Sequence, residues 1–174
     1  WLIVCRENNN DPLADHVGCE NAGQTAVFLF YNHQQKFHSL AFSPAGESTA
    51  LKDINLLDKV ISVERSESAM QIAADFIREK NFSTIAVNIS SKNAQADGLS
   101  YTQYEQLTGA LGETFSQRLT SADEVIYQWL SIKLPEEIDI MRRAAELTAK
   151  WQIEAYQQVK PGITTDADLA RFLK

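Results

Sequence analysis

Apolar and polar positions follow two different periods over the first two thirds of the chain. Short runs of β-branched and aromatic residues predict strands, and apolar residues spaced three or four apart predict helices. The strands are predicted at residues 1–5, 25–31, 36–42, 59–63 and 84–89, with an edge strand at 115–119. The helices are predicted at residues 50–57, 66–80 and 100–111. This alternation predicts the α/β class, with a mixed β-sheet flanked by helices.

The second and third predicted strands form a β-hairpin. The turn between them is predicted at residues 32–35, which are all polar. Residues 25–31 are apolar at nearly every position, so both faces of this strand are expected to be covered, as in the centre of a sheet.

The pattern changes after residue 132. Pro135, followed by two acidic residues, is a typical helix start. Apolar residues then recur at helical spacing at Ile140, Met141, Ala144, Leu147, Trp151, Ala155 and Val159. They predict a helix of about 24 residues that ends at the Pro161–Gly162 pair. Thr165 with Asp168 is a capping box that opens a further helix.

Charge supports a division at the same place. Residues 1–132 carry 9 basic and 16 acidic side chains, whereas residues 133–174 carry 7 of each. We therefore predict two domains, residues 1–131 and residues 132–174. The overall charge of −7 argues against nucleic-acid partners, and the absence of a long apolar run argues against a membrane span.

Few residues suggest chemistry. The histidines His16, His33 and His38 lack the spacing of a metal site, and Cys5 in an apolar strand and Cys19 in a polar segment form no cysteine cluster. The loop at residues 6–11 follows a strand, where α/β sheets often build sites, but plain turns have the same composition. We therefore assign no catalytic, cofactor-binding or metal-binding residue in this chain.

Two stretches carry a resemblance to a known family. Residues 134–145, Leu-Pro-Glu-Glu-Ile-Asp-Ile-Met-Arg-Arg-Ala-Ala, and residues 160–166, Lys-Pro-Gly-Ile-Thr-Thr-Asp, bracket the long helix. They resemble the opening of the pita-bread catalytic domain in the creatinase, prolidase and aminopeptidase P family. Leu134 departs from the family pattern, which has serine there. Residues 1–12, 86–91 and 96–105 resemble the N-terminal domain that precedes it, most closely in bacterial Xaa-Pro peptidase-like proteins.

The resemblance implies a role for the whole protein. Residues 1–131 would be a creatinase N-terminal-like domain, and residues 132–174 the truncated start of the pita-bread domain. The family binds two divalent metal ions (Mn, Co or Zn) through two Asp, one His and two Glu that lie beyond residue 174, so this segment alone would be inactive. It would help form a homodimer and narrow access of peptide substrates to the active site of a metal-dependent Xaa-Pro aminopeptidase or dipeptidase.

Two alternatives stay open on the same fold. One is a binding protein that has lost catalysis, as in a chaperone-like relative. The other is a creatinase-like hydrolase of a non-peptide C–N bond. Because an apolar strand opens the sequence and a helical pattern closes it, we expect a piece of a longer chain. The compartment is therefore undecided, with the cytoplasm favoured.

Overall fold

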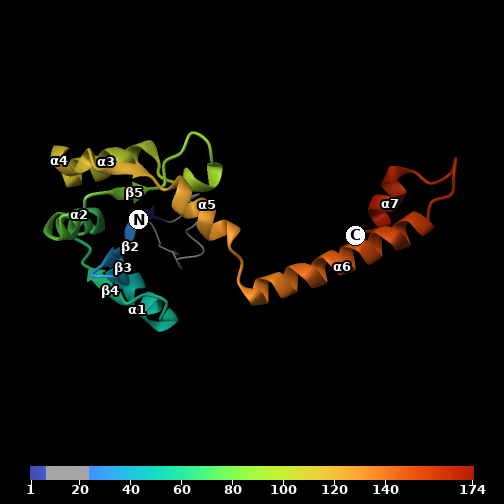
Figure 1. Cartoon of the computed structure of the whole chain (residues 1–174), viewed down its shortest axis with the longest axis horizontal. Coiled ribbons are helices and arrows are strands. Elements are labelled where there is room, and N and C mark those ends of the chain that lie inside the picture. The colour runs from blue at the N-terminus through green and yellow to red at the C-terminus, as the bar shows by residue number, and fades with distance from the viewer. Residues whose placement is uncertain (7–23) are drawn as a thin grey trace. The chain divides into compact units, whose positions relative to one another are not determined.

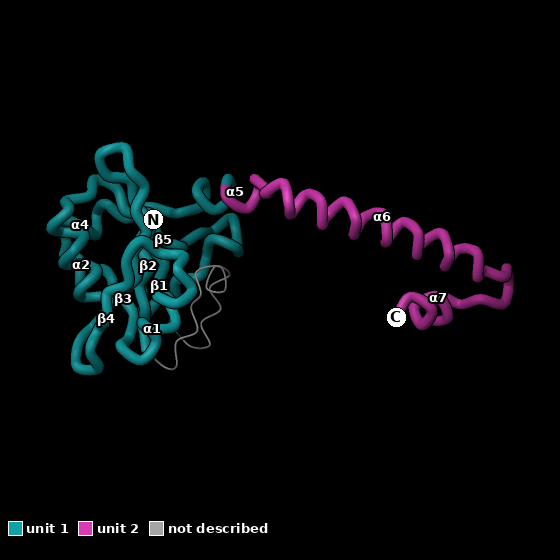
Figure 2. The backbone as a smooth tube through the Cα atoms, turned by 90° about the horizontal axis from the view of Figure 1, so that it is seen from below, with its two compact units in different colours: residues 1–128 teal, residues 129–174 magenta. Residues whose placement is uncertain are grey.

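The computed structural model describes residues 1–6 and 24–174. Its elements divide into two compact units, Trp1–Gln128 and Trp129–Lys174 (Figures 1 and 2). The first unit holds all the described strands, and the second consists of helices and their connections.

A six-stranded mixed sheet organises the first unit, in the order β4-β3-β2-β1-β5-β6. The strands are β1 (Leu2–Cys5), β2 (Ala26–His33), β3 (Lys36–Pro44), β4 (Lys59–Val63), β5 (Ile85–Val87) and β6 (Leu119–Ser121). β2 is antiparallel to both neighbours, whereas β3 with β4, β1 with β5, and β5 with β6 are parallel pairs. The predicted α/β class with a mixed sheet is therefore confirmed.

The main core lies on one face of the sheet. Alternate strand residues point to this face, and α2 (Ala69–Lys80) and α3 (Tyr101–Leu111) cover it. Its members include Leu2, Val27, Leu40, Phe42, Ile77 and Leu107. α2 begins where Ser68 accepts a hydrogen bond from the Gln71 N–H, and α3 begins with the reciprocal Ser100–Gln103 capping box. The sequence pattern predicted both helices to within three residues at either end.

Ile3, Cys5, Phe28 and Ala41 point to the opposite face and are fully buried. α1 (Ala45–Ile54) lies against this face, because the Ser48 hydroxyl on α1 is 3.3 Å from the Ser62 hydroxyl on β4. Helix α5 (Asp123–Ser131) begins directly after β6 and crosses the unit boundary.

Two predicted elements were wrong in position. The helix predicted at 50–57 is α1, which begins five residues earlier because it follows β3 without an intervening loop. The edge strand predicted at 115–119 is a short helix, α4 (Glu113–Ser116), followed by β6. Phe115 lies on this helix, and its side chain packs against the core. The Arg118 guanidinium carbon lies over the Phe115 ring, 4.1 Å from the ring centroid.

The second unit is helical. α6 (Pro135–Gln157) and α7 (Asp166–Phe172) are joined by the Pro161–Gly162 turn, in which Gly162 has φ +75°. Leu134 offers no side-chain cap to α6, but the Glu137 carboxylate accepts a hydrogen bond from the Leu134 N–H at 2.7 Å. The Thr165–Asp168 capping box opens α7, as predicted.

Candidate functional site

A crevice opens at the edge of the sheet where β3 and β4 end. Its larger cavity, about 600 Å³, is lined by Pro44 and Val63 at the strand ends and by Glu64, Glu67 and Ser68 in the turn into α2. A second cavity of about 300 Å³ adjoins the first turn of α1, where Ala45, Gly46 and Arg65 line it. Gln24 and Glu64 line both cavities, so the two form one crevice.

The chain path creates this crevice. β3 leads directly into α1 on one face of the sheet, and β4 leads into α2 on the other face. The helices that follow two neighbouring parallel strands therefore separate at the carboxyl ends of those strands, where open α/β sheets place their ligands. No residue of the crevice is among those that the sequence singled out; the only signal was that residues 64–68 follow a strand.

The polar groups of the crevice hold the turn together. The Ser68 hydroxyl accepts from the Gln71 N–H at 3.3 Å, and the Glu67 carboxylate accepts from the Glu64 N–H at 3.0 Å. Among the described residues that line the crevice there is neither a histidine nor a cysteine to act with them. The described residues of this crevice hold no nucleophile–base pair for hydrolysis.

The residues with shifted pKa values lie outside the crevice. Burial lowers the pKa of the Trp1 amino group. Hydrogen bonds from Ser39 lower the pKa of Asp58, and hydrogen bonds from Thr165 lower that of Asp168. The hydrogen bond to Glu105 raises the pKa of Tyr101. Each of these shifts is explained by burial or by a hydrogen bond. None of the four residues lines the crevice.

The histidines and cysteines considered from the sequence are not brought together. His33 is exposed at the end of β2, opposite Lys36, and the ring of His38 stacks on Tyr31 at 5.0 Å. Cys5 is fully buried. His16, Cys19 and residues 7–11 of the polar loop lie outside the described residues. Within residues 1–6 and 24–174, no group of three His, Cys, Asp or Glu side chains could hold a metal ion.

The fold defines an α/β unit with a six-stranded mixed sheet, followed by a long helix and a short one. Two solved structures match 99% of this chain with a TM-score of 0.55: an X-Pro aminopeptidase from Thermotoga maritima, at 16% identity, and a Xaa-Pro dipeptidase from Bacillus anthracis, at 12% identity. The N-terminal domain of a Xaa-Pro dipeptidase from Lactobacillus brevis matches 64% of this chain and is itself covered to 77%, at 14% identity and a TM-score of 0.42. No family model and no curated protein matches the sequence.

The resemblance predicted from the sequence is therefore confirmed as a likeness of fold. The chain spans 44% of the length of the Thermotoga protein and 42% of the Bacillus protein. Among the described helices, none is long and apolar enough to cross a membrane.

Proposed function

We propose that this chain is the N-terminal, non-catalytic part of a metal-dependent hydrolase that removes the residue before a proline, as an Xaa-Pro aminopeptidase or dipeptidase does. One observation carries the proposal. The fold likeness to two Xaa-Pro peptidases covers 99% of this chain, the α/β unit as well as the helices that follow it. It covers 44% and 42% of those proteins, which leaves room for a separate catalytic part.

The proposal places the catalytic chemistry outside this chain. Residues 1–6 and 24–174 hold no group of three metal-ligating side chains, and those that line the crevice at the ends of β3 and β4 include no catalytic pair. The two divalent metal ions of such an enzyme would activate a bridging water and polarise the scissile carbonyl. That chemistry would belong to residues outside this chain.

The contribution of this chain would be assembly and access. The exposed apolar residues of α6, Ile140, Leu147 and Trp151 among them, offer a surface on which another part of the protein can fold or a second copy can pack. In the proposed homodimer, the α/β unit would narrow the entrance to an active site and so select short peptide substrates.

The test uses the 174-residue chain and the product of the complete reading frame that encodes it. Both are assayed on Xaa-Pro dipeptides, on longer Xaa-Pro peptides and on creatine, with Mn²⁺, Co²⁺ or Zn²⁺ and after chelation. We expect the complete product to cleave Xaa-Pro bonds in a metal-dependent way and the 174-residue chain to be inactive.

Other results would contradict this proposal, and each would indicate a different function. Cleavage of creatine alone would indicate a hydrolase of a non-peptide C–N bond. A complete product that lacks the metal ligands and cleaves nothing would indicate a binding protein on this fold. Isothermal titration of the 174-residue chain should detect no stoichiometric submicromolar site for Mn²⁺ or Zn²⁺, and finding one would place metal chemistry in the wrong part of the protein.

A further inference from the structure

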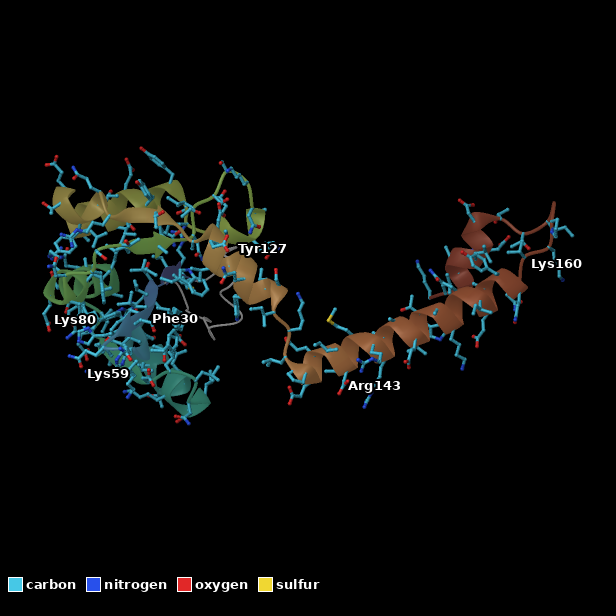
Figure 3. All side chains as sticks on the ribbon, in the orientation of Figure 1. Phe30, Lys59, Lys80, Tyr127, Arg143 and Lys160 are labelled. Carbon is cyan, nitrogen blue, oxygen red and sulfur yellow. The ribbon has the colours of Figure 1, made fainter. Side chains whose placement is uncertain are left out.

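One edge of the sheet stays open over a short stretch, whatever reaction the whole protein performs. β4 is the outermost strand on this side, and among the described strands it pairs with β3 alone. Its sequence, Lys-Val-Ile-Ser-Val, has a single charge, at Lys59, which Figure 3 labels. Such an edge is a surface on which another strand can pair, because its outer N–H and C=O groups have no partner strand.

The alternation of backbone directions shows which residues of β4 face outward. The Ser39 N–H donates to the Asp58 carboxylate at 2.8 Å, so Ser39 and every second residue after it on β3 face β4. The parallel register matches Ala41 with Val60, so Ala41 bonds to the residues on either side of Val60. The backbone N–H and C=O groups of Val60 and Ser62 therefore point away from β3.

The open stretch is only these two residues long, because the next groups on either side of it are occupied. The Asp58 N–H donates to the Ser39 hydroxyl at 3.0 Å. The Glu64 N–H donates to the Glu67 carboxylate at 3.0 Å, and the Glu64 carbonyl accepts from the Glu67 N–H at 2.9 Å. A long strand of another protein would find no free N–H at Asp58 or Glu64. A strand edge that is open over the same short length matches this one better.

We propose that the β4 edge pairs with the β4 edge of a second copy of this chain, antiparallel, around a two-fold axis at Ile61. Val60 then lies opposite the partner's Ser62, and Ser62 lies opposite the partner's Val60. All four outward groups of each copy are hydrogen-bonded in this register. An axis at Val60 or at Ser62 would instead set one open residue opposite an occupied one. The half-buried Ile61, which packs against the core, meets its own counterpart across the axis.

Like charges weaken this pairing in a way that identifies its register. The axis at Ile61 places Asp58 opposite the partner's Glu64, and it does so twice in the dimer. Carboxylates directly opposite each other on neighbouring strands repel. We therefore expect a weak dimer that becomes tighter when salt screens these exposed charges, and tighter still when the charge of Glu64 is removed.

The test uses the 174-residue chain with Trp151→Glu, which places a charge in the exposed stripe of α6 and so suppresses association through that helix. We expect sedimentation to show a dimer with a Kd of about 100 µM, as for a small interface. Val60→Pro removes an outward N–H and leaves the bonds to β3 intact, so it should raise the Kd at least about tenfold. Val60→Ile keeps the N–H and should stay within about twofold, and Glu64→Gln should lower the Kd about threefold.

Hydrogen exchange tests the same edge without a substitution in β4. At ~1 mM chain the Ser62 amide should exchange about fivefold more slowly than in dilute solution, because most chains are then paired. The Ile61 amide bonds to β3 and should exchange equally at both concentrations. A chain that stays monomeric at ~1 mM, or a Ser62 amide indifferent to concentration, would overturn the proposal. Equal association of Val60→Pro and Val60→Ile would overturn it too, and Glu64→Gln without tightening would exclude the axis at Ile61.

Discussion

The two units differ in what they do with their apolar side chains: the first buries many of them, and the second leaves most of them exposed. In the α/β unit, strands and helices bury Phe28, Phe42, Ile77 and Leu107 almost completely. In the helical unit, α6 buries Ala155 alone, while Leu147 is 44% exposed and Trp151 is 49% exposed. Figure 3 shows the side chains of α6, Arg143 among them, extending outward along its whole length. A helical pattern therefore establishes that a face is apolar, whereas only the fold decides whether the chain itself covers it.

The largest expected effect tests the core of the α/β unit. Phe42 is 1% exposed and its ring meets that of Phe76 at 5.8 Å. Phe42→Ala should lower the free energy of unfolding by about 3–5 kcal/mol, because it removes buried apolar surface and leaves a cavity. Phe37→Ala, on the same strand at a position 59% exposed, is the matched control and should change it by less than about 0.5 kcal/mol. Chemical denaturation followed by circular dichroism measures both, and equal losses would mean that the exposed and buried faces of β3 are assigned wrongly.

The next effect concerns the exposed stripe of α6. We expect the chain to self-associate through Ile140, Leu147 and Trp151, because this apolar surface has no cover within its own unit. Trp151→Glu should weaken that association at least about tenfold, while leaving the Tm of the α/β unit unchanged. Gln152→Glu adds the same charge at the neighbouring exposed position and should have little effect. Analytical ultracentrifugation over a concentration series measures the association. A chain that stays monomeric, or a dimer indifferent to Trp151→Glu, would contradict this prediction.

Two helix caps, one in each unit, test whether the two units unfold separately. Ser68 caps α2 in the α/β unit and Thr165 caps α7 in the helical unit, each by accepting a backbone N–H. Ser68→Ala should destabilise the α/β unit by about 1 kcal/mol, since α2 belongs to its cooperative core. Thr165→Ala should fray α7 and leave the main transition in place. Hydrogen exchange resolved by residue distinguishes them, and a shift of the main transition by Thr165→Ala would show that the two units unfold together.

The smallest effect is a pH dependence within the α/β unit. Asp58 accepts hydrogen bonds from the Ser39 N–H at 2.8 Å and from its hydroxyl at 3.2 Å, which lowers the pKa of Asp58. A carboxyl with a lower pKa in the folded state stabilises the fold above its unfolded pKa, and this contribution is lost as the pH falls through the folded pKa. Asp58→Asn should therefore lower the Tm slightly at neutral pH, and the difference should vanish well below pH ~4. A difference that persists unchanged at low pH would assign the effect to something other than this ionised carboxylate.

Local sequence signals predicted most of the fold. Residues 59–63 form β4 as predicted, and Pro135 and the Thr165–Asp168 pair mark the starts of α6 and α7, because each signal acts within one turn of chain. The errors arose where tertiary contacts decide. The sequence pattern predicts a strand at Phe115, but Phe115 lies on the short helix α4 and its ring packs against the α/β core. Gly46 is a poor helix former, yet α1 begins at Ala45, directly after β3 ends at Pro44.

The candidate site could not be predicted from the sequence. The prediction that the histidines and cysteines form no metal centre stays a prediction; of their described members, Cys5 is buried, His33 is exposed and His38 stacks on Tyr31. The crevice at the ends of β3 and β4 could not be foreseen. It depends on α1 and α2 leaving neighbouring strands toward opposite faces, and no residue pattern encodes that choice locally.

The register of β1 has a consequence for synthesis on the ribosome. β1 emerges first, but its partner on one side, β5, pairs with it through Leu2 and Val87, which are separated by most of the α/β unit. The hairpin of β2 and β3 needs only local chain and can form early, together with its pairing to β1. The other edge of β1 must wait for β5, and β5 itself is completed by β6, at residues 119–121. A nascent chain halted between β4 and β5 would thus present β1 with one unpaired edge, and such an edge is a site where another strand can pair wrongly.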